Sequence, residues 1–565
     1  MSAPAKVSKH GPPLAWWVPA ALAAPALIPV ANAYLVPYWR GQWPTGFIQY
    51  DMPYYMANAR EHFDQGLQLT YGNPYAPYGT PAIYSQPHIL LLGVLQRLGL
   101  DPGLAFNLFS LAAIVFAVLV AIHFYRMLVG LDTTARKLGL ICFIWGGGAL
   151  VLFGSARSIA TGHLTWDGVM HYDWFDGWWM LNFGRNLVSP TEAYYHGVFL
   201  LSILCLIQRR FVASLALAAL LSWSHPFSGL SLALVLFIFS AVEWALRSGA
   251  VKAVMPIGSA AILACHLGYY MIFLNRFPSH RALREQWSLA WLYPPGTFIP
   301  ALLFVGVLAA IRLMDPPGLR RALSKPDIRL LAVWFGVVFG LSQHNLIVKP
   351  FQPIHFAHGY DWTALFFLGV PVLVGLFDHL LTIRPTSFRL PAVAGVLAIL
   401  LLDNVVWLTG FLVDSPIPQR IALSMDQKTL LDWLASNGAP ENTVVCGDAT
   451  VSYLVSTYTR ARSWYGHVSN TPDYLQRRRE AHEALSKMHF MPEWARMAAS
   501  PARSTIRAIE ASGIATPIPK ISVHYNVLYI ADRAEDWRPP GDETMLYQNN
   551  EFTVWGRNAS IRQQQ

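Results

Sequence analysis

The sequence predicts a polytopic α-helical membrane protein with a small α/β domain at its C-terminal end. Of 565 residues, 54% are apolar and 13% are charged, and the mean hydropathy is +0.35; soluble domains carry about 25% charged residues. The apolar residues gather in runs of the length that crosses a bilayer, about 20 residues each. Beyond about residue 414 these runs end. The composition excludes a soluble globular protein and a disordered chain.

About eleven apolar runs are candidate membrane spans. The segment Trp223-Ser224-His225-Pro226 separates two of them or kinks one. The first run ends in Ala31-Asn32-Ala33, which resembles a signal-peptidase site, but it exceeds the roughly 7–15 apolar residues of a signal sequence, so we interpret it as an uncleaved anchor. The candidate spans are 14–36, 103–129, 138–154, 194–208, 211–224, 227–246, 253–273, 297–314, 328–346, 361–383 and 389–413.

Basic residues occupy alternate connections between these runs, and this explains the net charge of +9 without a nucleic-acid partner. By the positive-inside rule, the N-terminus lies in the cytoplasm and the C-terminal domain outside, as expected for a bacterial cytoplasmic (inner) membrane protein. The outside loops 37–87, 155–193, 274–296 and 347–360 are long and chemically varied, which is typical of a working face.

The segments after residue 413 alternate between helix and strand patterns. A helix is expected over 426–437, a strand over 443–446, helices near 470–489 and 502–512, and strands over 527–531 and 552–556. We therefore divide the chain into a transmembrane domain, 1–413, and an extracytoplasmic α/β domain, 414–565. The four cysteines have neither a disulfide framework nor zinc-ligand spacing.

The first outside loop holds the main candidate for a catalytic base. Asp51 lies at the membrane boundary among aromatic rings, where partial desolvation suits a carboxylate to accept a proton. Tyr54 and Tyr55 offer stacking surface and hydroxyl groups for a sugar. The structural alternative is that Asp51 caps a helix starting at Pro53 and that the tyrosines belong to an interfacial belt.

The second outside loop combines acids with tryptophans in WDGVMHYDWFDGWW (166–179). Asp173 and Asp176, with Glu192 at the start of the next span, are candidates for binding sugar hydroxyls or a divalent ion. An aromatic loop lying on the membrane surface with solvated acids is the alternative.

Cationic side chains are expected to form a ring at the outer boundary, where a lipid phosphate would lie, because arginine and lysine hold phosphate by charge-assisted hydrogen bonds. Each alone is also consistent with a snorkelling residue. The candidates are Arg157, Arg185, His225, Lys349, His355 and His358. Asp403-Asn404, within the last span, is interpreted as a satisfied helix-to-helix hydrogen bond.

The pattern of motifs resembles the GT-C glycosyltransferases, integral-membrane enzymes that use polyprenyl-phosphate-linked sugars, and among them the bacterial protein mannosyl- and aminoarabinose-transferase superfamily. The resemblance covers nearly the whole chain in architecture. It depends on Tyr50-Asp51 with Tyr54-Tyr55, a surface helix within 81–100, His225-Pro226, Gln352-Pro353-Ile354-His355-Phe356, Tyr465-Gly466-His467 and Thr471-Pro472-Asp473-Tyr474.

The resemblance implies an inverting transfer of sugar from a polyprenyl-phosphate donor to a hydroxyl of an envelope glycan, glycolipid or protein, with Asp51 as general base. Met52 stands where several relatives have a second acid. If that acid is needed, Asp173, Asp176 or Glu192 must replace it, so a requirement for Mg²⁺ or Mn²⁺ stays open.

Two other functions are compatible with the sequence. One is a transporter or flippase for a lipid-linked or anionic solute, which predicts ionisable groups near mid-membrane and a repeated half. The other is a non-catalytic protein of envelope-polysaccharide assembly. Polar chemistry confined to one face favours the enzyme.

Overall fold

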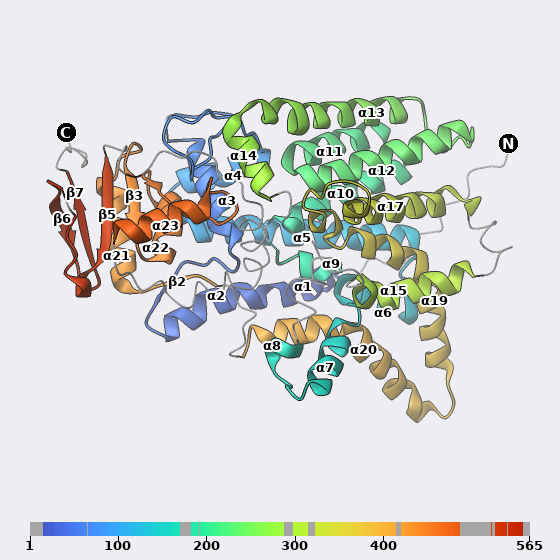
Figure 1. The fold of residues 1–565 in the computed structure, drawn as a ribbon. Helices are drawn as coiled ribbons and strands as arrows, with labels where there is room; N and C mark the ends of the chain where they lie inside the picture. The colour runs from blue at the N-terminus through green and yellow to red at the C-terminus, as the bar shows by residue number, and fades with distance from the viewer. Residues whose placement is uncertain are drawn as a thin grey trace.

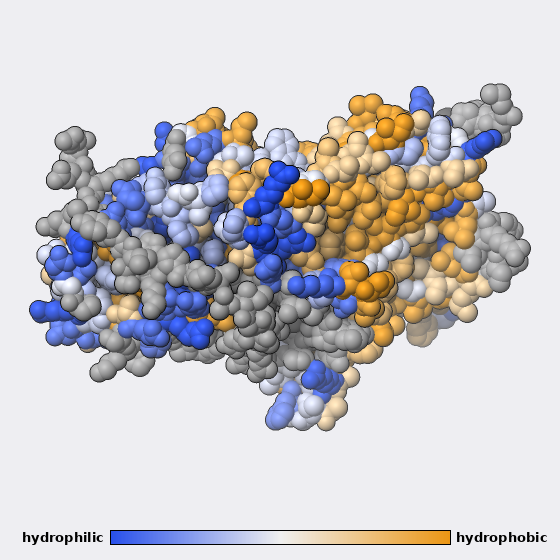
Figure 2. Space-filling model, turned by 45° about the horizontal axis from the view of Figure 1, so that its top comes forward, coloured by the Kyte–Doolittle hydropathy of each residue, from blue (hydrophilic) through white to orange (hydrophobic). Residues whose placement is uncertain are grey.

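The computed structural model places a helical part beside a β-sheet part, with the sheet at one end of the molecule (Figure 1). Apolar side chains gather over the helical part and polar ones over the other end (Figure 2). The structure describes residues 15–64, 66–169, 182–189, 191–287, 298–314, 323–413, 420–485, 521, 526–539 and 541–557.

Every predicted apolar run within the described residues forms helix, which makes the chain a multi-pass membrane protein. Six helices are long and apolar enough to cross a membrane, or seven if one bent pair counts as a single span; Glu192–Ile207, Phe211–Ser224 and Phe298–Leu313 are apolar but shorter. The count of eleven stays a prediction. The helices are α1–α2 (Trp17–Ala23, Leu27–Trp39), α5 (Pro102–Leu128), α6 (Thr134–Trp145), α7 (Leu150–Ala160), α10 (Glu192–Ile207), α11 (Phe211–Ser224), α12 (Pro226–Ala245), α13 (Val254–Leu267), α15 (Phe298–Leu313), α17 (Pro326–Ser342), α19 (Tyr360–Thr382) and α20 (Arg389–Gly410).

The predicted span 138–154 is wrong as one continuous helix. It is split between α6 and α7, which are bent by 61° at residues 146–149. Glycines allow the backbone at this break to lie close to α20 and α15. A Cβ on Gly147 would lie 2.7 Å from Asp403 Cβ, and a Cβ on Gly148 would lie 2.3 Å from the Ala301 carbonyl oxygen. The hydropathy pattern does not reveal the break because the glycines are not polar.

Asp403 and Asn404 of α20 form hydrogen bonds with backbone groups at this break, where the helical hydrogen bonds are interrupted. The Asp403 carboxylate accepts from the backbone N–H groups of Gly148, Leu150 and Val151 at 2.9–3.2 Å. The Asn404 amide donates to the Trp145 carbonyl oxygen at 2.8 Å. The interpretation of this pair as a helix-to-helix hydrogen bond is confirmed.

The first outside loop contains two helices, α3 (Asp51–Glu61) and α4 (Pro87–Arg97). α3 begins two residues before Pro53, so Asp51 lies in its first turn. α4 is the helix expected within 81–100. At the other predicted break, α11 and α12 are separate helices, because Pro226 cannot continue α11 and His225 becomes the N-cap of α12.

Residues after 420 form a five-stranded sheet of mixed direction in the order β4-β3-β5-β7-β6. β3 pairs parallel with β4 and β5, while β7 pairs antiparallel with β5 and β6. The predicted helix near 502–512 lies outside the described residues, and the division after residue 413 stays a prediction. The elements are α21 (Met425–Asn437), β3 (Thr443–Cys446), α22 (Ala449–Tyr458), β4 (Arg462–Ser463), α23 (Tyr474–Ala484), β5 (Val527–Asp532), β6 (Thr544–Gln548) and β7 (Phe552–Gly556).

The C-terminal part is bonded to the first loop through α22. Thr457 Oγ1 donates to the Pro53 carbonyl oxygen at 2.9 Å, and the Tyr453 hydroxyl donates to the Tyr50 carbonyl oxygen. A salt bridge of 2.8 Å joins Arg462 Nη2 to Glu61 Oε2 at the other end of α3. These contacts hold α3, and therefore Asp51, against residues some 400 positions later in the chain.

Candidate active site

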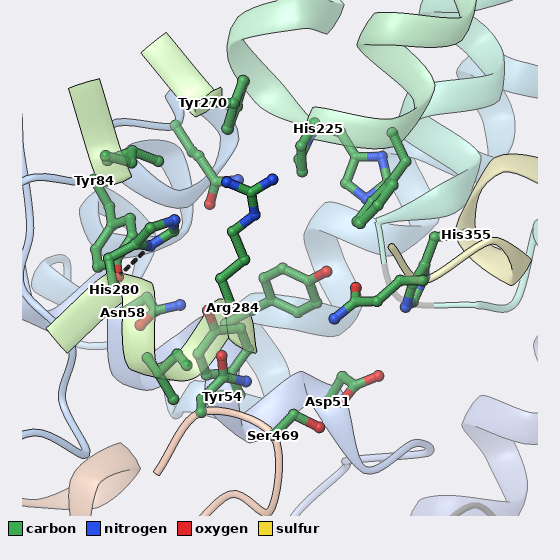
Figure 3. Close-up of a pocket in the computed structure, with 18 of the residues that line it drawn as sticks. Asp51, Tyr54, Asn58, Tyr84, His225, Tyr270, His280, Arg284, His355 and Ser469 are labelled. Carbon is green, nitrogen blue, oxygen red and sulfur yellow. Dashed lines mark hydrogen bonds between the residues drawn. The ribbon is translucent and has the colours of Figure 1, made fainter. Parts of the chain in front are cut away.

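A cavity of about 330 Å³ lies where the first loop, the ends of several membrane helices and the C-terminal part meet. Figure 3 shows Asp51 and Ser469 at one side, Tyr270 and His225 at the opposite side, and Arg284 projecting between them. The walls combine many polar groups with an apolar portion that includes Phe227 and Leu230. A polar cavity with an apolar extension fits a ligand that is itself part polar and part apolar.

Asp51 is placed for chemistry on a ligand in this cavity. It sits in the first turn of α3, at the positive end of the helix dipole. Its side chain is 39% exposed. Oδ1 lies 2.9 Å from Nε2 of His467, and no other hydrogen bond to the carboxylate occurs within the described residues. The alternative of a helix-capping acid is excluded, because α3 has no side-chain cap.

Tyr54 and Tyr55 line the same cavity. Their rings lie 5.5 Å apart between centroids. Burial, with smaller contributions that include the Asp51 charge, raises the pKa of Tyr54 to about 12. Burial also raises the pKa of Tyr55. Both hydroxyls therefore stay protonated at neutral pH and can donate hydrogen bonds to a ligand.

His225 and His355, two histidines of the predicted cationic ring, line the cavity, but their imidazole rings are neutral. Burial first, and the neighbouring histidines second, lower the pKa of both. His225 Nδ1 accepts from the backbone N–H of Ser228 at 3.2 Å, which leaves its Nε2 to carry the proton. These rings are neutral hydrogen-bonding groups until an anion arrives.

Arg284, on α14 (Pro278–Trp287), supplies the arginine of the cavity. Its guanidinium donates to Met271 Sδ at 3.4 Å and lies 5.0 Å from the centroid of the Phe351 ring. Neither contact neutralises its charge. Beside it, His280 is held by the Tyr84 hydroxyl at 3.0 Å, and burial together with Arg284 lowers the pKa of His280 to about 4.

Glu192 and His358 reach the cavity as a connected pair. Glu192 is buried in the first turn of α10, and its Oε1 lies 2.8 Å from Nδ1 of His358. Nε2 of His358 in turn lies 3.3 Å from Nδ1 of His355. Glu192 and His358 both line the cavity, on the side of the histidines, and the predicted sugar-binding role of Glu192 stays a prediction.

Three of the remaining sequence-predicted residues, Arg157, Arg185 and Lys349, are described by the structure and do not line this cavity. Arg157 and Lys349 are exposed and do not line it. Arg185 lies over the Trp407 ring, 4.9 Å from its centroid, on the side of the broken helix. Asp173 and Asp176 lie outside the described residues. Their predicted roles stay predictions.

The described residues contain no group of three or more His, Cys, Asp or Glu side chains that could hold a metal ion. Near Asp51, the first neighbour is a histidine that donates a hydrogen bond, and Met52 offers no oxygen ligand. These residues alone do not fit a Mg²⁺ or Mn²⁺ site.

Sequence reasoning missed the roles of His467 and Arg284. His467 lay within a segment noted only for its resemblance, and Arg284 within an outside loop noted only for its length and composition. No spacing signal links either to Asp51, because His467 is 416 residues away along the chain. Asn58, Asn73 and Asn470 also line the cavity and had no distinguishing pattern.

Comparison with known proteins finds similarity at the level of solved structures. No protein-family model matches the chain, and no curated protein matches it. One similar structure is ArnT from Cupriavidus metallidurans bound to undecaprenyl phosphate, at 14% identity over 97% of this chain and 99% of that chain, with a TM-score of 0.37.

Archaeoglobus fulgidus contributes two further similar structures. Its oligosaccharyltransferase tethered to an acceptor peptide matches at 12% identity over 88% of this chain and 72% of that chain, with a TM-score of 0.45. The oligosaccharyltransferase AglB in complex with an inhibitory peptide and a dolichol-phosphate matches at 12% over 92% and 69%, with a TM-score of 0.41.

Proposed function

We propose that this chain is a membrane glycosyltransferase that moves a sugar from a polyprenyl-phosphate donor to an acceptor hydroxyl with inversion. The observation that carries the proposal is the cavity itself: a half-exposed carboxylate, Asp51, shares it with an arginine, Arg284, and with the buried histidines His225 and His355. A base and an anion-binding wall are the two groups that such a transfer needs.

Asp51 acts as the general base. The free carboxylate oxygen, Oδ2, takes the proton of the acceptor hydroxyl as the hydroxyl oxygen forms its bond to the anomeric carbon. The bond between that carbon and the donor phosphate oxygen breaks, and its electron pair leaves with the lipid phosphate. Attack from the face opposite the leaving group inverts the anomeric configuration.

Arg284 and the two histidines stabilise the departing phosphate. The guanidinium offers a fork of N–H donors that matches phosphate oxygens. His225 offers its Nε2–H from an N-cap position fixed by Ser228. An arriving phosphate favours protonation of the buried imidazoles, so positive charge would develop where the leaving group gains negative charge.

The lipid tail leaves the cavity between α12 and the segment after α13. Met271 and Leu274 line the cavity, while Ile272 and Phe273 of the same segment are 59% and 40% exposed on the outer surface. This segment, Gly268–Phe273, is a π-helix, so it departs from regular packing where the lipid would pass.

The proposal extends to location and acceptor. The chain lies in a bacterial cytoplasmic (inner) membrane with its N-terminus in the cytoplasm, and the cavity and C-terminal part face the periplasm. The acceptor is an envelope glycan, a glycolipid or a protein hydroxyl. A transporter or flippase, or a non-catalytic assembly protein, is not favoured, because the charged groups gather in one cavity beside the C-terminal part.

The test is turnover with a panel of undecaprenyl-phosphate-linked hexoses and pentoses. The full-length protein in lipid nanodiscs is incubated with each sugar and with envelope extract as acceptor, and the release of undecaprenyl phosphate is measured. Release that depends on one sugar and on Asp51 supports the proposal. Failure of every sugar in the panel, by a folded protein, would overturn it.

A further inference from the structure

We propose that His467, from the C-terminal part, is the positioning residue of Asp51, so that the site is complete only when the C-terminal part is docked on the first loop. This inference rests on the proposed function, because it assigns His467 a role through the base. The sequence pattern around His467 does not by itself indicate a chemical role for this residue.

The first observation is the contact between the two side chains. His467 Nε2 lies 2.9 Å from Asp51 Oδ1, and the histidine side chain is 2% exposed while the aspartate is 39% exposed. Here one partner is enclosed and the other faces the cavity, as expected for a support that leaves its carboxylate accessible.

The second observation fixes where the imidazole proton is. The backbone N–H of Ser469 donates to Nδ1 of His467 at 3.0 Å, and the amide nitrogen of Asn470 lies 3.0 Å from the same atom. Nδ1 is therefore an acceptor, and the neutral ring carries its proton on Nε2. His467 thus donates to Asp51 Oδ1 without cancelling the negative charge, and Oδ2 is left for the acceptor hydroxyl.

The third observation is that the ring cannot turn away. Four tyrosines surround it, with centroid distances of 4.5 Å to Tyr50, 5.1 Å to Tyr54, 5.6 Å to Tyr453 and 6.2 Å to Tyr75. Two of these, Tyr50 and Tyr54, flank Asp51 on α3 or its N-cap. The enclosure fixes both ends of the hydrogen bond relative to each other.

The backbone after His467 is fixed as well. The N–H groups of Asn470 and Thr471 donate to the His467 carbonyl oxygen at 3.1 and 2.9 Å. Asn73 of the first loop donates to the Asn470 carbonyl oxygen at 2.8 Å. The hydroxyl of Tyr50 accepts from the Val468 N–H at 2.8 Å. The position of the donor is therefore set by the docking of two distant segments, not by a mobile loop.

A matched pair of substitutions separates positioning from structure. In His467→Gln the side-chain amide reaches as far as Nε2 and can donate to Asp51. In His467→Asn it reaches only as far as Nδ1, where its oxygen can still accept from Ser469 but nothing reaches Asp51. Both variants keep a polar side chain of smaller volume in the same enclosure, so a loss that arises from packing alone affects them together.

The measurement is steady-state turnover of the full-length protein with the undecaprenyl-phosphate sugar that supports release of undecaprenyl phosphate. We expect H467N to lower kcat about 30- to 100-fold with the KM for that donor within about threefold, because a misplaced base costs rate rather than donor binding. H467Q should stay within about fivefold of the wild-type kcat. The thermal unfolding midpoints of the two variants should agree with each other.

Two results would overturn the inference: an H467N enzyme as active as wild type, or equal losses of kcat in H467N and H467Q. Asp51→Asn separates this failure from failure of the proposed function. If D51N retains turnover, the proposed base is wrong. If D51N is inactive while H467N is fully active, only the positioning role is wrong. The double variant D51N/H467N should be no slower than D51N, because His467 acts through Asp51.

Discussion

Asp51 and Asp403 are both acids within or beside apolar helices, yet their surroundings are opposite. Asp403 is completely buried, and both of its oxygens accept from backbone N–H groups at the start of α7. Asp51 uses one oxygen for His467 and is 39% exposed to the cavity. A carboxylate whose lone pairs are all engaged stabilises a fold, whereas one with an unused oxygen facing a cavity can accept a proton.

The same comparison distinguishes two arginines. Arg185 lies over Trp407 near the broken helix, whereas Arg284 projects into the cavity. Both are arginines of predicted outside loops, so the sequence cannot separate them. The surroundings decide which one can meet a ligand.

The largest expected effect is on catalysis. Asp51→Asn keeps the shape of the side chain but removes its ability to take a proton, so we expect turnover to fall by about three orders of magnitude, in the middle of the range for the loss of a general base. Initial rates of undecaprenyl phosphate release measure this. The thermal unfolding midpoint of the variant should not fall. Turnover close to that of the wild type would show that Asp51 is not the general base.

A large effect on stability is expected from Asp403→Leu. Three buried N–H groups at the start of α7 would lose their acceptor, and the free energy of unfolding should fall by about 2–4 kcal/mol. Denaturation in detergent micelles measures this. Asp378→Asn, on the exposed side of α19, is the control and should change stability by less than about 0.5 kcal/mol. Equal stability of the two variants would contradict the capping role.

Donor binding should separate the two arginines. Arg284→Ala removes the arginine of the cavity, and because hydrogen bonds to charged groups contribute about 1.5–3 kcal/mol, we expect the donor KM to rise about tenfold or more. Arg185→Ala should leave that KM within about twofold. If instead Arg185→Ala weakens the donor and Arg284→Ala does not, the ring predicted from the sequence describes the phosphate site better than the cavity does.

The smallest effect is expected from Tyr54→Phe. One neutral hydrogen bond contributes about 0.5–1.5 kcal/mol, so the KM for acceptor should rise about three- to fivefold. Because the pKa of Tyr54 is raised to about 12, its hydroxyl stays protonated below pH 10, and the pH dependence of kcat should keep its shape in the variant. If kcat of the wild type falls at high pH and this fall is absent in Y54F, Tyr54 loses its proton within the pH range of the assay, and the prediction is wrong.

Much of the fold could be predicted because it depends on local patterns. Apolar runs predicted the membrane helices, and the strand over 443–446 is found at the predicted residues. The break between α6 and α7 could not be predicted, because it depends on Asp403 and Asn404 from a helix 250 residues later. The helix α22 and the strand β6 were also missed, since neither carries a strong periodic pattern.

For the site, the sequence by itself determined the candidate base, because an acid between aromatic residues at a membrane boundary is a local feature. Tertiary structure alone decided its partner, its exposure and the cation opposite. His467, Arg284 and Asp51 come from three segments far apart in the chain. The docking of α22 and its following loop on α3 brings His467 to Asp51, whereas Arg284 reaches the same cavity from α14. The physical reason is that availability for chemistry depends on which lone pairs the neighbours occupy, and those neighbours are chosen by packing rather than by sequence spacing.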